Sequence, residues 1–125
     1  MKYLLDTHIL LWWLDGDKRL SKKFKKVIED TSIIKLVSVA SIWEIIIKVQ
    51  AKKLPLKTSV ENLVKKIMFP ILNIDVIHVL KLIKLPDIHK DPFDRMLVAQ
   101  ARSEDCILLT DDKNIKKYKV STLSP

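Results

Sequence analysis

Short apolar runs alternate along this chain with longer stretches in which apolar residues recur at helical spacing. The continuous apolar runs, which are typical of buried strands, cover 2–5, 33–37, 71–74 and 106–109. A fifth, edge strand is expected over 118–120. The helical spacing, together with the positions of the prolines, predicts helices over 7–14, 21–30, 39–53, 59–68, 76–84 and 92–104.

Strands that alternate with helices predict an α/β fold, in which a parallel sheet of four to five strands is covered by helices on both faces. A length of 125 residues suffices for one domain with a core and is short for two, so 1–125 is expected to be a single domain. The longest apolar run, 9–14, is far below the roughly 20 residues that span a bilayer. We therefore expect no membrane association and a cytoplasmic location.

The composition narrows the classes of function. The formal net charge of +8 favours polyanions such as nucleic acids as partners, although frequent lysine codons in an AT-rich genome explain it equally well. The chain has one glycine, Gly16, which excludes the glycine-rich loops that cradle phosphates. Its one cysteine, Cys106, excludes an internal disulfide.

Acidic residues gather at one edge of the predicted sheet. Asp6 ends the first strand, and Asp112 lies just beyond the end of the fourth. Glu44 lies in the first turns of the helix after the second strand, and Asp91 and Asp94 begin the helix that leads into the fourth. Ligands of parallel α/β sheets bind beyond the carboxyl ends of the strands, which is the edge that these acids share.

Each of these acids also has an ordinary structural explanation. Ser41 and Glu44 have the spacing of a capping box, and Asp91 is a good N-cap for a helix whose positive end Asp94 would complement. Asp111 or Asp112 can cap a short C-terminal helical turn, and Asp6 can cap the first helix.

Acids that only cap separate helices need not lie close together, whereas the ligands of one metal ion must. Two carboxylates 4 Å apart repel by about 4 kcal/mol at an effective dielectric constant of 20, so a cluster of them needs a neutralising partner. A hard divalent cation is the simplest such partner, and the lack of paired histidines argues against zinc. The pattern therefore predicts a site for Mg²⁺ or Mn²⁺.

Four sequence strings in order and register carry a resemblance to a known family. They are YLLDTHILLWWL (3–14), SVASIWEIIIK (38–48), HKDPFDRMLVAQA (89–101) and LLTDD (108–112). Together they resemble the PIN domain, and specifically the VapC-type toxins of toxin–antitoxin pairs. The resemblance implies a PIN-like three-layer sandwich and a metal-dependent endoribonuclease that forms a homodimer and is inhibited by a cognate antitoxin.

The resemblance also implies which residues form the catalytic and metal site. The four acids of the family correspond to Asp6, Glu44, Asp94 and Asp112. Asp91 and Asp111 stay open as further metal ligands, and Thr110, Arg95 and His8 stay open as residues that contact the substrate or support the ligands. The mechanism implied is hydrolysis of an RNA phosphodiester bond by a metal-activated water.

Two other classes of protein fit less well. A receiver-type signalling domain would have an acidic pair at the end of its first strand, where Asp6 stands alone, and a phosphatase with an aspartate nucleophile would have a second aspartate at His8. A catalytically silent module with the same fold is disfavoured by the complete set of acids.

Overall fold

The computed structural model describes residues 1–123, whose strands form one five-stranded parallel sheet in the order β3-β2-β1-β4-β5. The strands are β1 (Lys2–Leu5), β2 (Ile34–Ser38), β3 (Ile71–Leu72), β4 (Ile107–Leu109) and β5 (Thr122–Leu123). The helices are α1 (Thr7–Asp15), α2 (Lys22–Glu29), α3 (Val39–Gln50), α4 (Val60–Lys65), α5 (Val76–Lys81) and α6 (Pro92–Ser103), with the short 3-10 helices η1 (Leu82–Lys84) and η2 (Ile115–Lys117). None of these helices is long and apolar enough to cross a membrane.

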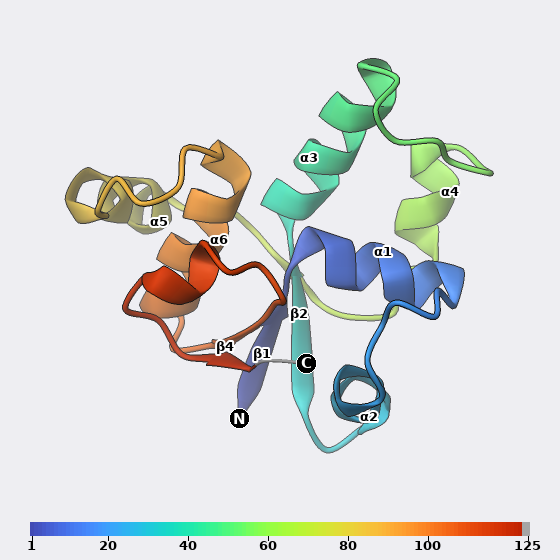
Figure 1. Ribbon diagram of the computed structural model, residues 1–125, viewed down its shortest axis with the longest axis horizontal. Coiled ribbons are helices and arrows are strands. Elements are labelled where there is room, and N and C mark those ends of the chain that lie inside the picture. The colour runs from blue at the N-terminus through green and yellow to red at the C-terminus, as the bar shows by residue number, and fades with distance from the viewer. Residues whose placement is uncertain (124–125) are drawn as a thin grey trace.

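Helices cover both faces of the sheet, because successive side chains of a strand point to opposite sides. Tyr3 and Leu5 of β1 belong to a core cluster that includes Phe24 of α2, whereas Leu4 belongs to a second cluster that includes Leu97 of α6. Figure 1 shows the resulting layers, with α1, α2 and α4 on one side of the strands, α5 and α6 on the other, and α3 above the end of β2. The expected three-layer α/β architecture is therefore confirmed.

The strand order reverses between β1 and β4. The chain moves outward from β1 to β2 and β3, and then returns to pair β4 with the other side of β1. In open α/β sheets this reversal opens a crevice at the carboxyl ends of the two central strands. Asp6 and Thr110, which follow β1 and β4, flank that crevice.

The fifth strand was expected over 118–120 and lies instead at Thr122–Leu123. Residues 118–120 cannot pair in extended form because the backbone N–H of Val120 bonds to the carbonyl of Tyr118 at 2.9 Å, which closes a tight turn. Three helices are also shorter than their apolar spacing predicts. The third helix ends at Gln50, before Lys52 adopts a positive φ of 58°, and the helix expected over 76–84 changes to 3-10 geometry at Leu82. The helix expected over 59–68 spans Val60–Lys65, because the backbone N–H groups of Lys66 and Ile67 bond three residues back and tighten its end.

A buried polar network joins β2 to helices α3 and α6. The Ser38 hydroxyl accepts a hydrogen bond from the backbone N–H of Ala40, which caps α3, and donates to Oε1 of Gln100 at 2.5 Å. The amide of Gln100 in turn donates to the carbonyl of Asn73 at 3.2 Å. Ser38 and Gln100 are fully buried, so every lost partner in this network leaves an unsatisfied polar atom in the core.

We expect Ser38→Ala to lower the free energy of unfolding by about 2–4 kcal/mol, because it removes a helix cap and also leaves Gln100 without its buried donor. The matched control is Ser59→Ala, since Ser59 caps the N-terminus of α4 at an exposed position and bonds only to the N–H of Asn62. That change should cost about 1 kcal/mol. Urea denaturation of both variants measures the difference, and equal losses would contradict the coupling of the cap to Gln100.

Candidate active site

Asp6 is placed by the register of β1 against β4. Leu5 pairs with Leu109, and the next backbone N–H, that of Asp6, donates to the carbonyl of Leu109 at 3.0 Å. The residues that follow the two strands therefore lie side by side, and the hydroxyl of Thr110 donates to Oδ2 of Asp6 at 2.7 Å. The other carboxylate oxygen, Oδ1, accepts the N–H of Thr7 at 2.7 Å at the start of α1. Asp6 is thus both an N-cap and a site residue.

Burial controls the protonation of Asp6. Only 2% of the residue is exposed, and this loss of hydration raises the pKa of its carboxyl to about 6. The hydrogen bond from Thr110 and the charge of His8 oppose the rise, whereas the charge of Glu44 adds to it. The pKa is raised even though both oxygens accept hydrogen bonds, so the environment disfavours the negative charge unless a cation is near.

Glu44 reaches the same crevice from α3. Ser38 rather than Ser41 caps this helix, and the Ser41 hydroxyl instead accepts a hydrogen bond from the Thr7 hydroxyl at 2.9 Å. The capping-box explanation for Glu44 is therefore removed. Oε2 of Glu44 lies 2.8 Å from the ammonium of Lys48, one turn further along the helix. Oε1 is buried and has no hydrogen-bond partner within residues 1–123.

At the start of α6, Asp91 caps the helix and Asp94 extends into the crevice. Oδ1 of Asp91 accepts the N–H groups of Phe93 at 2.8 Å and Asp94 at 3.1 Å, as an N-cap does. The Asp94 side chain turns away from this cap into the crevice, where the residue is 8% exposed. Its pKa is raised to about 8, first by burial and then by the negative charges of the neighbouring acids, which are Asp6, Asp91, Glu44 and Asp112.

The two carboxylate oxygens of Asp112, just beyond the end of β4, have different contacts. Its Oδ1 accepts the N–H of Asn114 at 2.7 Å and caps the turn that leads into η2. Its Oδ2 lies 3.7 Å from Nε2 of His89, and the same nitrogen lies 2.8 Å from Oδ2 of Asp94. Asp111 points elsewhere, since it lines a pocket of about 390 Å³ beside α1 together with His8 and Trp12.

The remaining candidates occupy different positions. Thr110 is fully buried, and its hydroxyl also accepts the N–H of Asp112 at 3.0 Å, so it joins the ends of both central strands. The guanidinium of Arg95 donates to backbone carbonyls, including that of Pro86 at 2.9 Å. His8 is exposed and packs its ring 6.3 Å from that of Trp12.

The site predicted from the sequence does not include His89, which the structure places in the cluster. His89, Asp94 and Asp112 offer one ligand atom each, and the three atoms lie within 4.8 Å of one another. The signal available was the short spacing from His89 to Asp91 and Asp94. The path of the connection over 87–91, which decides where the imidazole points, is not encoded in any local pattern.

The residues present fit a divalent cation. Two acids from helices α3 and α6 and two from the ends of β1 and β4 converge on one crevice, and burial raises the pKa values of Asp6 and Asp94, with the neighbouring negative charges adding to the rise. Glu44 contributes a buried oxygen without a partner among residues 1–123. Carboxylate oxygens are the ligands that Mg²⁺ and Mn²⁺ prefer.

The fold and this site define a class of α/β proteins with an acidic, metal-type centre at the switch point of a parallel sheet. The family model of the PIN domain matches residues 3–120. The chain therefore belongs to the PIN domain family, whose members are nucleases. Comparison with curated protein sequences finds no match.

Solved structures of toxin–antitoxin complexes share the fold. The VapBC2 complex of Rickettsia felis, bound to a DNA fragment from its promoter, aligns with a TM-score of 0.74 at 13% identity, covering 99% of this chain and 98% of the other. DNA-bound VapBC from Salmonella typhimurium aligns with a TM-score of 0.74 at 15% identity and the same coverage. A toxin–antitoxin complex from Klebsiella pneumoniae gives a TM-score of 0.68 at 18% identity, covering 98% and 97%.

The raised pKa of Asp94 makes the stability of the metal-free protein depend on pH. The pKa is about 8 in the folded chain against an ordinary value of 3.8, so the folded chain binds more protons between these values. This contribution is complete below about pH 4 and is lost as the pH rises through about 8; Asp6 adds a smaller effect of the same sign. Urea denaturation in EDTA should therefore show lower stability at pH 8 than at pH 5.

Asp94→Asn is the matched variant, because it keeps the shape of the side chain and removes the group that must ionise. It should be more stable than the wild type at pH 8 and should lose less stability between pH 5 and pH 8. A wild-type protein that gains stability over this range, with no change in the variant, would show that the acids do not repel one another.

Proposed function

We propose that this chain is a divalent-metal-dependent endoribonuclease and the toxin of a toxin–antitoxin pair. The observation that carries the proposal is the convergence of Asp6, Glu44, Asp94 and Asp112 at the switch point of a PIN domain. The reaction is hydrolysis of an RNA phosphodiester bond. RNA as the substrate is consistent with a cytoplasmic location.

Asp6, Asp94 and Asp112 would hold Mg²⁺ or Mn²⁺, with Glu44 bound directly or through a water. The ion, when bound, supplies an activated water and offsets negative charge on the phosphate. Thr110 keeps Oδ2 of Asp6 in place by its 2.7 Å hydrogen bond, and Lys48 holds one oxygen of Glu44 while the other has no partner among residues 1–123. Asp91 keeps the first turn of α6 intact and so fixes the position of Asp94.

The surface charge supports a nucleic-acid substrate. An acidic crevice alone would repel a phosphodiester, so the approach of RNA requires positive charge elsewhere on the protein. Helix α2 exposes Lys22, Lys23, Lys25 and Lys26, and the chain carries a net charge of +8. Long-range attraction to this surface raises the encounter rate, and it weakens as salt increases.

We propose that the antitoxin binds beside the active site, along α1. The pocket of about 390 Å³ there is bounded by Leu11, Trp12, Leu54 and Leu56, and its polar rim includes Asp111. On the far side of the crevice, Trp43 of α3 is 55% exposed and packs edge-on against Phe93 at 5.1 Å. Apolar side chains on both sides of a catalytic crevice suit a protein partner that covers it.

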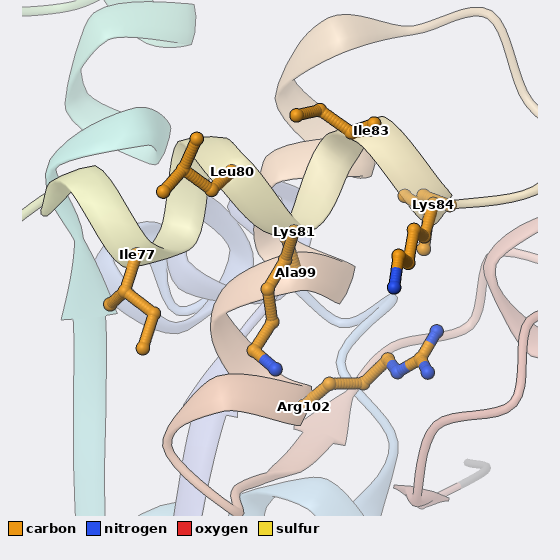
Figure 2. A pocket seen from close by; sticks show the side chains of 8 residues that line it. Ile77, Leu80, Lys81, Ile83, Lys84, Ala99 and Arg102 are labelled. Carbon is orange, nitrogen blue, oxygen red and sulfur yellow. The ribbon is translucent and has the colours of Figure 1, made fainter.

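We propose that α5 and η1 form the homodimer contact. Val76, Val79, Leu80 and Ile83 follow helical spacing and are each 47–77% exposed, which is unusual for four aliphatic residues on one short segment. A pocket of about 290 Å³ lies between this segment and α6. Figure 2 shows Lys81 and Lys84 extending across it toward Arg102, so the apolar stripe has a basic rim.

Asp6→Asn should abolish metal-dependent RNA cleavage while the protein stays folded, because the amide cannot supply the charge that the site needs. The control is Asp105→Asn, which makes the same change at an exposed position before β4, at the opposite edge of the sheet. The assay is cleavage of total cellular RNA with Mg²⁺ or Mn²⁺, and with EDTA. Full activity of Asp6→Asn, or activity in EDTA, would refute the proposed function.

Leu80→Lys should convert the dimer to a monomer, because it places a charge in the apolar stripe of each subunit. Leu80 is 56% exposed in the chain, so the change should have little effect on folding. Met68→Lys is the control, since Met68 is 86% exposed outside the stripe. Light scattering after size-exclusion chromatography gives the masses; an unchanged mass for Leu80→Lys would place the contact elsewhere.

A further inference from the structure

His89 holds a position in the carboxylate cluster that a metal ligand would hold. Its Nε2 lies 2.8 Å from Oδ2 of Asp94 and 3.7 Å from Oδ2 of Asp112, and the three ligand atoms fall within 4.8 Å of one another. Ligand atoms that each lie about 2 Å from one ion are separated by roughly 3–4 Å. The imidazole lies at this separation from Asp112, whereas its 2.8 Å contact with Asp94 is a direct one that would lengthen slightly around a shared ion.

The backbone around His89 is fixed by contacts made far from it in sequence. The N–H of His89 donates to the hydroxyl of Tyr118 at 2.8 Å, and Tyr118 is 3% exposed. Arg95 donates to that same hydroxyl at 3.3 Å and to the carbonyl of Pro86 at 2.9 Å. Because the backbone at His89 is already held in place, little conformational entropy would be lost when its imidazole binds an ion.

A metal ligand and a simple counter-ion predict different consequences at His89. As a counter-ion, a protonated imidazole would neutralise Asp94 and Asp112 and would have to leave when a cation arrives. As a ligand, a neutral imidazole would stay and bind the cation through Nε2. The second arrangement uses the same nitrogen, and it requires only that the 2.8 Å contact with Asp94 lengthen slightly while Arg95 and Tyr118 hold the connection in place.

We infer that His89 is a nitrogen ligand in the metal site, and that it makes the site prefer a first-row transition-metal ion such as Mn²⁺ over Mg²⁺. This inference rests on the proposed metal-dependent function. Mg²⁺ strongly prefers oxygen ligands, whereas first-row transition metals accept imidazole nitrogen. A set of carboxylates alone discriminates weakly between Mg²⁺ and Mn²⁺. One nitrogen ligand at this position raises the affinity for Mn²⁺ relative to that for Mg²⁺.

The test uses the full chain with Mn²⁺ as the probe. Pulsed electron paramagnetic resonance of the Mn²⁺ complex should show coupling to a directly bound ¹⁴N nucleus, and selective ¹⁵N-histidine labelling should replace it with ¹⁵N coupling. His89→Gln should abolish the signal, whereas Lys90→Gln should retain it. Lys90 is exposed and does not belong to the cluster of His89, Asp94 and Asp112.

Titration calorimetry measures the preference between the ions. Loss of a ligand should weaken Mn²⁺ binding by at least about tenfold in His89→Gln, with a smaller change for Mg²⁺. The labelling experiment needs no substitution, so the inference stays testable if that variant does not fold. Equal weakening for both ions would overturn the preference, and the absence of nitrogen coupling in the wild type would overturn His89 as a ligand.

Asp6→Asn separates failure of this inference from failure of the proposed function. If Asp6→Asn loses Mn²⁺ binding while the wild type shows no nitrogen coupling, the carboxylate site stands and only the role of His89 falls. If Asp6→Asn binds Mn²⁺ as tightly as the wild type, the proposed carboxylate site itself is wrong.

Discussion

The pairing of β1 with β4 is the constraint on which the site depends. Leu4 pairs with Leu108 and Leu5 with Leu109, and the two pairs pack into opposite faces of the sheet. A slip of one residue would turn each apolar side chain to the wrong face, so the core strongly selects this register. The same register sets Asp6 beside Thr110. The burial of leucines therefore positions the first two groups of an acidic site, although no leucine takes part in its chemistry.

Bringing the four acids together lowers the stability of the fold, and each acid has a local partner that offsets part of this cost. Thr110 donates to Asp6, Lys48 pairs with Glu44, and His89 approaches both Asp94 and Asp112. These partners do not fully offset the cost of burying the acids together with their mutual repulsion, because the pKa values of Asp6 and Asp94 remain raised. A site that is only partly neutralised by the protein keeps an affinity for a cation, since binding relieves the remaining repulsion.

Local patterns in the sequence predicted the parallel sheet, its central strands and the edge at which the acids meet. These features follow from periodicity and from the general geometry of α/β sheets, which need no knowledge of distant contacts. The fifth strand was misplaced because a tight turn at Tyr118 and Val120 overrides their apolar character. His89 was left out of the predicted site for a related reason: the connection over 87–91 is positioned by Arg95 and Tyr118, and those contacts exist only in the folded chain.

The two halves of the site are held by different forces, and this difference bears on how the site responds to ligands. Asp6 and Thr110 belong to paired strands inside the core, so their separation is set by backbone hydrogen bonds and apolar packing. Asp94 and His89 depend on the cap by Asp91 and on side-chain bonds to backbone groups of a connecting loop. Such bonds cost less to rearrange than a strand pair buried on both faces. Under the proposed function, adjustment to a bound ion or to RNA is therefore expected at the start of α6, while the sheet side of the crevice stays in place.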